Sequence, residues 1–127
     1  MAITRKLYPS AHIAELFFPL TDDENAVAQV VRRLADIGYY RGFETGIIHQ
    51  PAIAKTIRDL AGRHDLKVTQ WLTFELLKDR LNLSSLDKTL RETAINRACE
   101  LVHLAAECGT SKLSLVSGGD PGDTLRE

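Results

Sequence analysis

Four strand-like stretches alternate along this chain with helical segments, and this alternation constrains the fold more than any other feature. The expected strands are His12–Leu20, Arg41–Ile47, Lys67–Phe74 and Lys112–Ser117. Strands joined by crossovers of a dozen or more residues form a parallel sheet that helices cover. We therefore predict an α/β fold of parallel (β/α) units. About four strands are half the number in a TIM-type (β/α)8 barrel.

The helix boundaries are predicted from capping residues. Thr21 with Glu24 three residues on, and Ser84 with Asp87, each match the capping-box pattern at the start of a helix. The segment Glu75–Leu83 follows the third expected strand, and we interpret it as a loop with some helical character.

Composition favours one domain over residues 1–127, because no linker-like or low-complexity segment divides the chain. The formal net charge of −1 gives no electrostatic reason to expect a nucleic acid or an anionic membrane as partner. No apolar run approaches the roughly 20 residues of a membrane-spanning helix, so no membrane association is expected.

Both cysteines, Cys99 and Cys108, fall in one expected helix. A spacing of nine residues places them about 13 Å apart along a helix axis, which is too far for a disulfide. Free cysteines, together with a start that lacks a secretory apolar stretch, predict a cytoplasmic protein.

The junction Leu34-Ala-Asp-Ile-Gly-Tyr39, followed by a strand with a central Glu44, resembles the first helix-to-strand junction of the xylose-isomerase-like barrels. The stretch Thr89–Val116 is similar too, with a long helix and then a strand that leads into Ser117-Gly-Gly. This superfamily holds sugar and sugar-phosphate isomerases and epimerases, and also the apurinic-site endonucleases. The resemblance implies that this chain is the amino-terminal half of such a barrel.

The resemblance also implies where the chemistry lies. Family members usually hold a divalent metal (Mn, Mg or Zn) with two acidic residues, an aspartate and a histidine on strands five to eight. Those strands are not expected in this chain, so it would supply no metal ligand and no catalytic residue. The complete enzyme would abstract a proton next to a carbonyl while the metal polarises the oxygen. This chain would supply part of the lining for a sugar or sugar phosphate, without a cofactor of its own.

Glu44 and His49 are the first two candidate substrate-binding residues. Alternation along the second strand directs Phe43 toward the helices and Glu44 toward the barrel interior, where Glu44 could orient a substrate hydroxyl. The structural alternative is a buried ion pair, for instance with Arg41. His49 follows the same strand and could contact a hydroxyl or act as acid or base. Its alternative is an ordinary polar residue before the helix that Pro51 begins.

Trp71 and Ser117 complete the candidate set. Trp71 could stack on the apolar face of a sugar, or it could belong to the core. Its neighbour Gln70 faces the opposite side of the sheet. The loop that begins at Ser117 could hold a phosphate or hydroxyl with backbone N–H groups, or it could be a plain turn. His12 is expected at the bottom of the barrel, away from the chemistry.

Two alternatives to the isomerase hypothesis remain open. A non-catalytic half-barrel would expose sheet edges and would self-associate or pair with a complementary half. A well-folded monomer would instead favour an open flavodoxin-like sheet. An apurinic-site endonuclease-like barrel is the second alternative, but it needs basic loops to meet phosphates, and the chain has no basic cluster.

Overall fold

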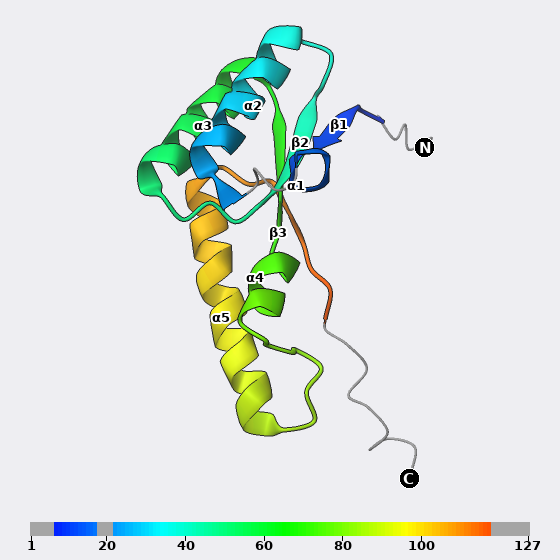
Figure 1. Cartoon of the computed structure of the whole chain (residues 1–127), viewed down its shortest axis with the longest axis vertical. Coiled ribbons are helices and arrows are strands. Elements are labelled where there is room, and N and C mark those ends of the chain that lie inside the picture. Colours follow the sequence, from blue (N-terminus) through cyan, green and yellow to red (C-terminus); the bar gives the residue numbers. More distant parts are fainter. Residues whose placement is uncertain (1–6, 18–21, 118–127) are drawn as a thin grey trace, which may run out of the picture.

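The computed structural model describes residues 7–17 and 22–117, and it is a mixed α/β fold with four parallel strands (Figure 1). Among these residues, no helix is long and apolar enough to cross a lipid bilayer. The elements in chain order are β1 (Ser10–His12), α1 (Ile13–Leu16), α2 (Glu24–Ile37), β2 (Gly42–Gly46), α3 (Pro51–His64), β3 (Lys67–Trp71), α4 (Thr73–Lys78), α5 (Lys88–Glu107) and β4 (Lys112–Ser114).

The strands lie side by side in the order β1-β2-β3-β4, so each strand pairs with the next one in the sequence. This order differs from the 2-1-3 order at the start of a flavodoxin-like sheet. Helices α2 and α3 pack next to each other on one face of the sheet, and α5 continues the same layer beyond them (Figure 1). The prediction of parallel (β/α) units with about four strands is therefore confirmed.

The core lies between this helical layer and one face of the sheet. Ala11, Phe43 and Val68 point into it from the three neighbouring strands, each at most 3% exposed. Because side chains alternate along a strand, Glu44 and Trp71 point to the opposite face, which we call the open face. Phe43 faces the helices as predicted, and Glu44 faces away from them. That this second face is the interior of a barrel stays a prediction.

Three expected strands are wrong over part of their length. The fourth was expected to reach Ser117 but ends at Ser114. The first ends at His12 and gives way to α1, and residues 18–20 of the expected strand lie outside the described residues. The third ends at Trp71, and α4 replaces the end of that strand and the start of the expected loop. The reason lies in packing: Leu72 and Leu76, four residues apart, are both buried in a second core cluster with Leu101 of α5.

The helix caps also differ from the prediction. Asp23 caps α2, because its carboxylate accepts hydrogen bonds from the backbone N–H groups of Asn25 and Ala26, at 2.9 and 3.2 Å. Thr21 lies outside the described residues. Asp87 caps α5 by accepting from the N–H of Leu90 at 3.0 Å, so the cap expected at Ser84 is wrong.

Tyr8 and Lys112 meet over the amino-terminal end of the open face. Lys112 Nζ of β4 donates a hydrogen bond to the Tyr8 hydroxyl at 3.0 Å and lies 5.3 Å from the centre of its ring. Tyr8 precedes β1, so the contact joins the two outer strands across β2 and β3. Gly42 allows this arrangement, because a Cβ atom there would lie 3.1 Å from the Tyr8 ring.

Candidate functional site

Three polar or aromatic side chains lie together on the open face, one from each of the first three strands. Trp71 Nε1 donates a hydrogen bond to Glu44 Oε2 at 2.9 Å. The His12 and Trp71 ring centres are 5.4 Å apart, and His12 Nε2 lies 4.0 Å from Glu44 Oε2. The side chains of His12 and Glu44 keep 26% and 28% of their surface exposed, so solvent reaches this cluster.

The position of His12 corrects its expected place at the bottom of the barrel. Because β1 ends at His12 rather than at Leu20, this residue pairs in register with Glu44. Its Nδ1 atom is buried and has no hydrogen-bond partner among the described residues. Burial of a polar atom without a partner costs free energy.

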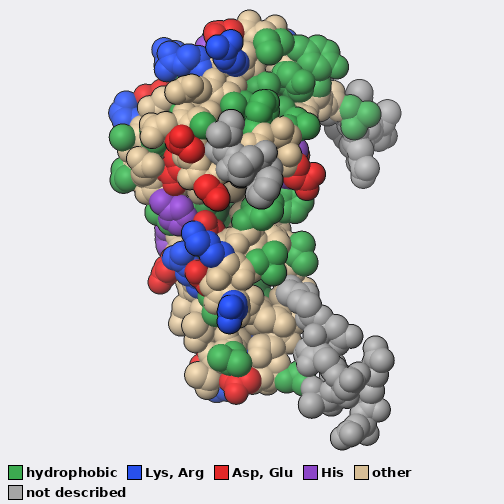
Figure 2. Space-filling model, in the orientation of Figure 1, with side chains coloured by type: hydrophobic (Ala, Val, Ile, Leu, Met, Phe, Trp, Pro, Cys, Tyr) green, Lys and Arg blue, Asp and Glu red, His purple; other side chains and the backbone are tan. Residues whose placement is uncertain are grey.

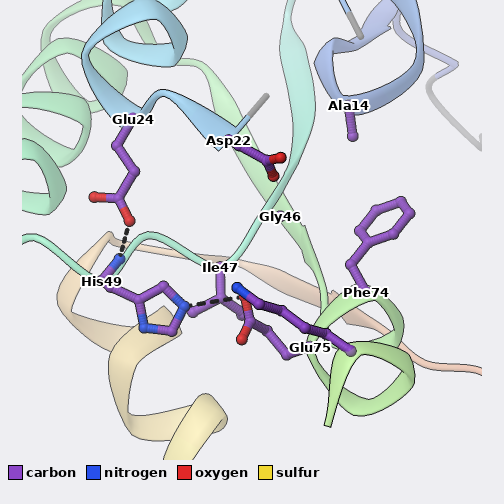
Figure 3. A pocket seen from close by; sticks show the side chains of 9 residues that line it. Ala14, Asp22, Glu24, Gly46, Ile47, His49, Phe74 and Glu75 are labelled. Carbon is purple, nitrogen blue, oxygen red and sulfur yellow. Dashed lines mark hydrogen bonds and ion pairs between the residues drawn. The ribbon is translucent and has the colours of Figure 1, made fainter. Parts of the chain in front are cut away.

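A pocket of about 410 Å³ adjoins this cluster at the carboxyl ends of the strands (Figure 3). Its walls come from the segments that follow β1, β2 and β3 and from the start of α2. The lining residues are Ala14, Asp22, Glu24, Gly46, Ile47, His49, Phe74, Glu75 and Lys78. The volume lies in the range of small-molecule sites. Five of the nine lining residues are charged or titratable, so the wall is more polar than is usual for such sites.

His49 is held in this pocket from two directions (Figure 3). Its ring Nε2 lies 3.0 Å from Glu75 Oε1, and its backbone N–H donates to Glu24 Oε1 at 2.7 Å. The other oxygen of Glu24 accepts from the backbone N–H of Gln50 at 2.9 Å. The His49 side chain is 42% exposed and Glu75 only 16%, so the histidine is accessible and its carboxylate partner is sheltered.

Arg97 of α5 holds Glu75 from the other side. Its guanidinium lies 3.6 Å from Glu75 Oε2, 2.9 Å from Asp79 and 3.0 Å from Glu100. Hydrogen bonds to Glu100 and Asp79 raise the pKa of Arg97, so the guanidinium stays charged. These ion pairs tie α4 to α5 and fix the position of the carboxylate that contacts His49.

The structure brings together three of the four predicted site residues. Glu44 and Trp71 are in contact, and Trp71 connects them to the pocket of His49 because its ring centre lies 6.4 Å from that of Phe74. Ser117 is not among the residues of the cluster or of the pocket lining. It is exposed, and its carbonyl accepts a hydrogen bond from Ser84 Oγ at 3.3 Å. The two glycines after it lie outside the described residues.

Sequence reasoning missed the two carboxylates that position His49. Glu24 was assigned to a helix cap, and Glu75 was placed in a loop. The signal that could have identified Glu75 is its position shortly after a strand of a parallel sheet, where site residues gather. Glu24 carries no such signal, because its contact with the loop after β2 depends on how α2 packs.

The described residues do not by themselves fit the divalent metal that the resemblance implies. Within residues 7–17 and 22–117, no group of three or more His, Cys, Asp or Glu side chains is placed to hold a metal ion. We therefore assign no step of the chemistry to a metal bound by these residues.

Comparison with known proteins assigns no role to these residues, since no family model and no curated protein matches the sequence. On the face shown in Figure 2, Lys and Arg side chains form separate groups with acidic side chains between them. This distribution does not favour the apurinic-site alternative, which needs a continuous basic surface. The function therefore has to be argued from the geometry of the site.

Proposed function

We propose that this chain is the amino-terminal half of a (β/α)8 barrel of the sugar or sugar-phosphate isomerase and epimerase class, and that it lines the substrate site. The observation that carries the proposal is the position of the Glu44–Trp71 contact beside the His49 pocket. Trp71 ends β3, and the pocket is lined by residues at and after the carboxyl ends of β1, β2 and β3, which is where barrel enzymes bind their substrates.

The side chains match the chemistry of a sugar. A carboxylate accepts hydrogen bonds from hydroxyl groups, so Glu44 can orient one while Trp71 holds its second oxygen. His49 can donate to or accept from a neighbouring hydroxyl, with Glu75 fixing its ring. Phe74 and Trp71 supply apolar surface for the C–H groups of the sugar.

The sheet supports the idea of half a barrel. Within the described residues, β1 and β4 each pair with another strand along one edge only. A row of unpaired backbone N–H and C=O groups invites further strands. In this proposal the remaining strands carry the metal and the residues that move the proton.

Ligand binding by the isolated chain tests the proposal. Trp71 is the only tryptophan, so fluorescence reports on the site directly, and we expect saturable changes with a panel of free sugars. Glu44→Gln should weaken this response, whereas Glu92→Gln on the exposed surface of α5 should not. Equal responses from the two variants would contradict the proposed site. Ketose–aldose exchange by this chain alone with added Mn²⁺ or Mg²⁺ would contradict the assignment of the chemistry to other strands.

A non-catalytic half-barrel that pairs with itself or with a complementary half is the second candidate. The observation in its favour is that Leu113, Leu115 and Val116, in and after β4, are 42%, 47% and 54% exposed. Apolar side chains beside an unpaired edge favour association.

Sedimentation velocity distinguishes this second candidate. We expect a dimer or larger assembly that Leu115→Lys disrupts, while Leu90→Lys, at a position on α5 that is 58% exposed, leaves it intact. A well-folded monomer at all concentrations would rule self-association out.

A further inference from the structure

We propose that the His49 pocket selects uncharged or cationic sugars and rejects phosphorylated ones, because the carboxylate of Glu24 occupies the donors that a phosphate would use. This inference rests on the proposed carbohydrate function and narrows its substrate class.

The turn from β2 into α3 has few backbone donors left for a phosphate. Backbone N–H groups at the turn between a parallel strand and the next helix commonly bind phosphate, helped by the helix dipole. Here both oxygens of Glu24 are used, one by the N–H of His49 at 2.7 Å and the other by that of Gln50 at 2.9 Å. Pro51, the first residue of α3, has no N–H. Three successive positions therefore offer no free donor to a phosphate.

The charges around the pocket are mainly negative. Three carboxylates line it, those of Asp22, Glu24 and Glu75, against the single ammonium group of Lys78. A phosphate dianion in such a pocket is repelled, whereas an ammonium group is attracted.

Arg97, the guanidinium that lies against Glu75, does not reverse this balance. It also pairs with Asp79 at 2.9 Å and Glu100 at 3.0 Å, so its charge is compensated outside the pocket lining. Hydroxyl groups remain well matched to the site, because they can donate to the carboxylates and bring no charge of their own. A neutral polyol or an amino sugar therefore fits better than a sugar phosphate.

Glucosamine, glucose and glucose 6-phosphate test this inference, because they share a ring and differ in charge. Amide chemical shifts of Gly46 and His49 measure binding to the pocket itself. At low salt we expect protonated glucosamine to bind about tenfold more tightly than glucose 6-phosphate, with glucose between them. The difference should shrink in about 1 M salt.

The three possible outcomes separate this inference from the proposed function. Binding of glucose 6-phosphate at least as tight as that of glucose would overturn the selectivity and leave the sugar site standing. Shifts with none of the three sugars would overturn the proposed function, and the selectivity with it.

A gain of binding provides the second test. Glu24→Gln removes one negative charge and one of the two backbone acceptors, so we expect affinity for glucose 6-phosphate to rise about fivefold to tenfold. Asp22→Asn removes a charge from the same pocket and leaves the backbone contacts of Glu24 in place. It should also raise the affinity for glucose 6-phosphate, and it serves as the test variant if Glu24→Gln does not fold. Glu92→Gln makes the same charge change on α5, away from the pocket lining. Equal ligand preference in all three variants would refute the inference.

Discussion

Substitutions of the adjacent residues Phe43 and Glu44 should separate the two faces of the sheet. Phe43 is 1% exposed in the core under α2 and α3, while the Glu44 side chain is 28% exposed on the open face. Phe43→Ala removes a large buried side chain and leaves a cavity. Glu44→Gln keeps the size of the side chain and an acceptor for Trp71, but it removes the charge.

The expected magnitudes differ clearly. Truncation of a buried phenylalanine costs about 3–5 kcal/mol of unfolding free energy. That is a large part of the roughly 5–15 kcal/mol that stabilises a domain. A buried hydrogen bond to a charged group is worth about 1.5–3 kcal/mol. Because water already reaches Glu44 and the glutamine can still accept the hydrogen bond, we expect Glu44→Gln to cost less than about 1 kcal/mol.

Urea unfolding followed by far-ultraviolet circular dichroism measures both costs without relying on Trp71, whose surroundings change in the Glu44 variant. Comparable slopes against urea are needed before the midpoints are compared. Glu92→Gln serves as a surface control. If Glu44→Gln destabilises the fold as much as Phe43→Ala, Glu44 is a structural residue, and the reasoning that assigns it to a ligand is wrong.

Four further outcomes are expected. In the native protein Cys99, which is exposed, should react with a thiol reagent, while Cys108, which is 0% exposed, should react only after unfolding. Burial raises the pKa of the Cys108 thiol from 9.0 to about 12. Because the thiol then ionises first in the unfolded chain, the free energy of unfolding should fall as pH rises from 9.0 to about 12. Cys108→Ala should remove that part of the pH dependence. Gly62→Ala should stabilise α3 by about 0.5–1 kcal/mol, because a Cβ atom there meets no atom within 4 Å. Gly38→Ala should instead cost about 1 kcal/mol, because the backbone there has a φ of 70°. Thermal unfolding measures both changes. Arg97→Ala should lower the free energy of unfolding by about 1–2 kcal/mol, because it removes the ion pairs of Arg97 with Glu75, Asp79 and Glu100. Amide hydrogen exchange in α4 should become faster, and unchanged exchange would refute the coupling of α4 to α5.

The sequence predicts the fold well where one periodicity dominates. At Phe43 and Glu44 the alternation of side chains along a strand assigns the two residues to opposite faces, and the structure agrees. The stretch after His12 contains short apolar runs that fit a strand or a helix equally, and only packing decides between them. Ile13 is 0% exposed in α1, while Leu16 is 66% exposed, which a continuous buried strand would not allow.

The site was predictable only in part. His49 was identified because barrel enzymes place site residues after their strands, and this rule needs only the order of the elements. Glu44 was identified from side-chain alternation and the family resemblance, and Trp71 from the capacity of its ring to stack on a sugar. The contacts of His49 with Glu24 and Glu75 span 25 and 26 residues. Such contacts depend on how helices pack, which local sequence patterns do not encode. Ser117 was chosen from its glycine-rich surroundings, and its backbone hydrogen bond to Ser84 gives no sign of a ligand site.

The contact between Tyr8 and Lys112 joins two residues that are 104 positions apart in the sequence. Because Tyr8 precedes β1 and Lys112 begins β4, this side-chain link runs between the two outer strands of the described sheet, in addition to the backbone pairing through β2 and β3. Replacing Tyr8 by alanine would remove the hydrogen bond and the ring contact together, and with them a direct tie between the beginning and the end of the described chain.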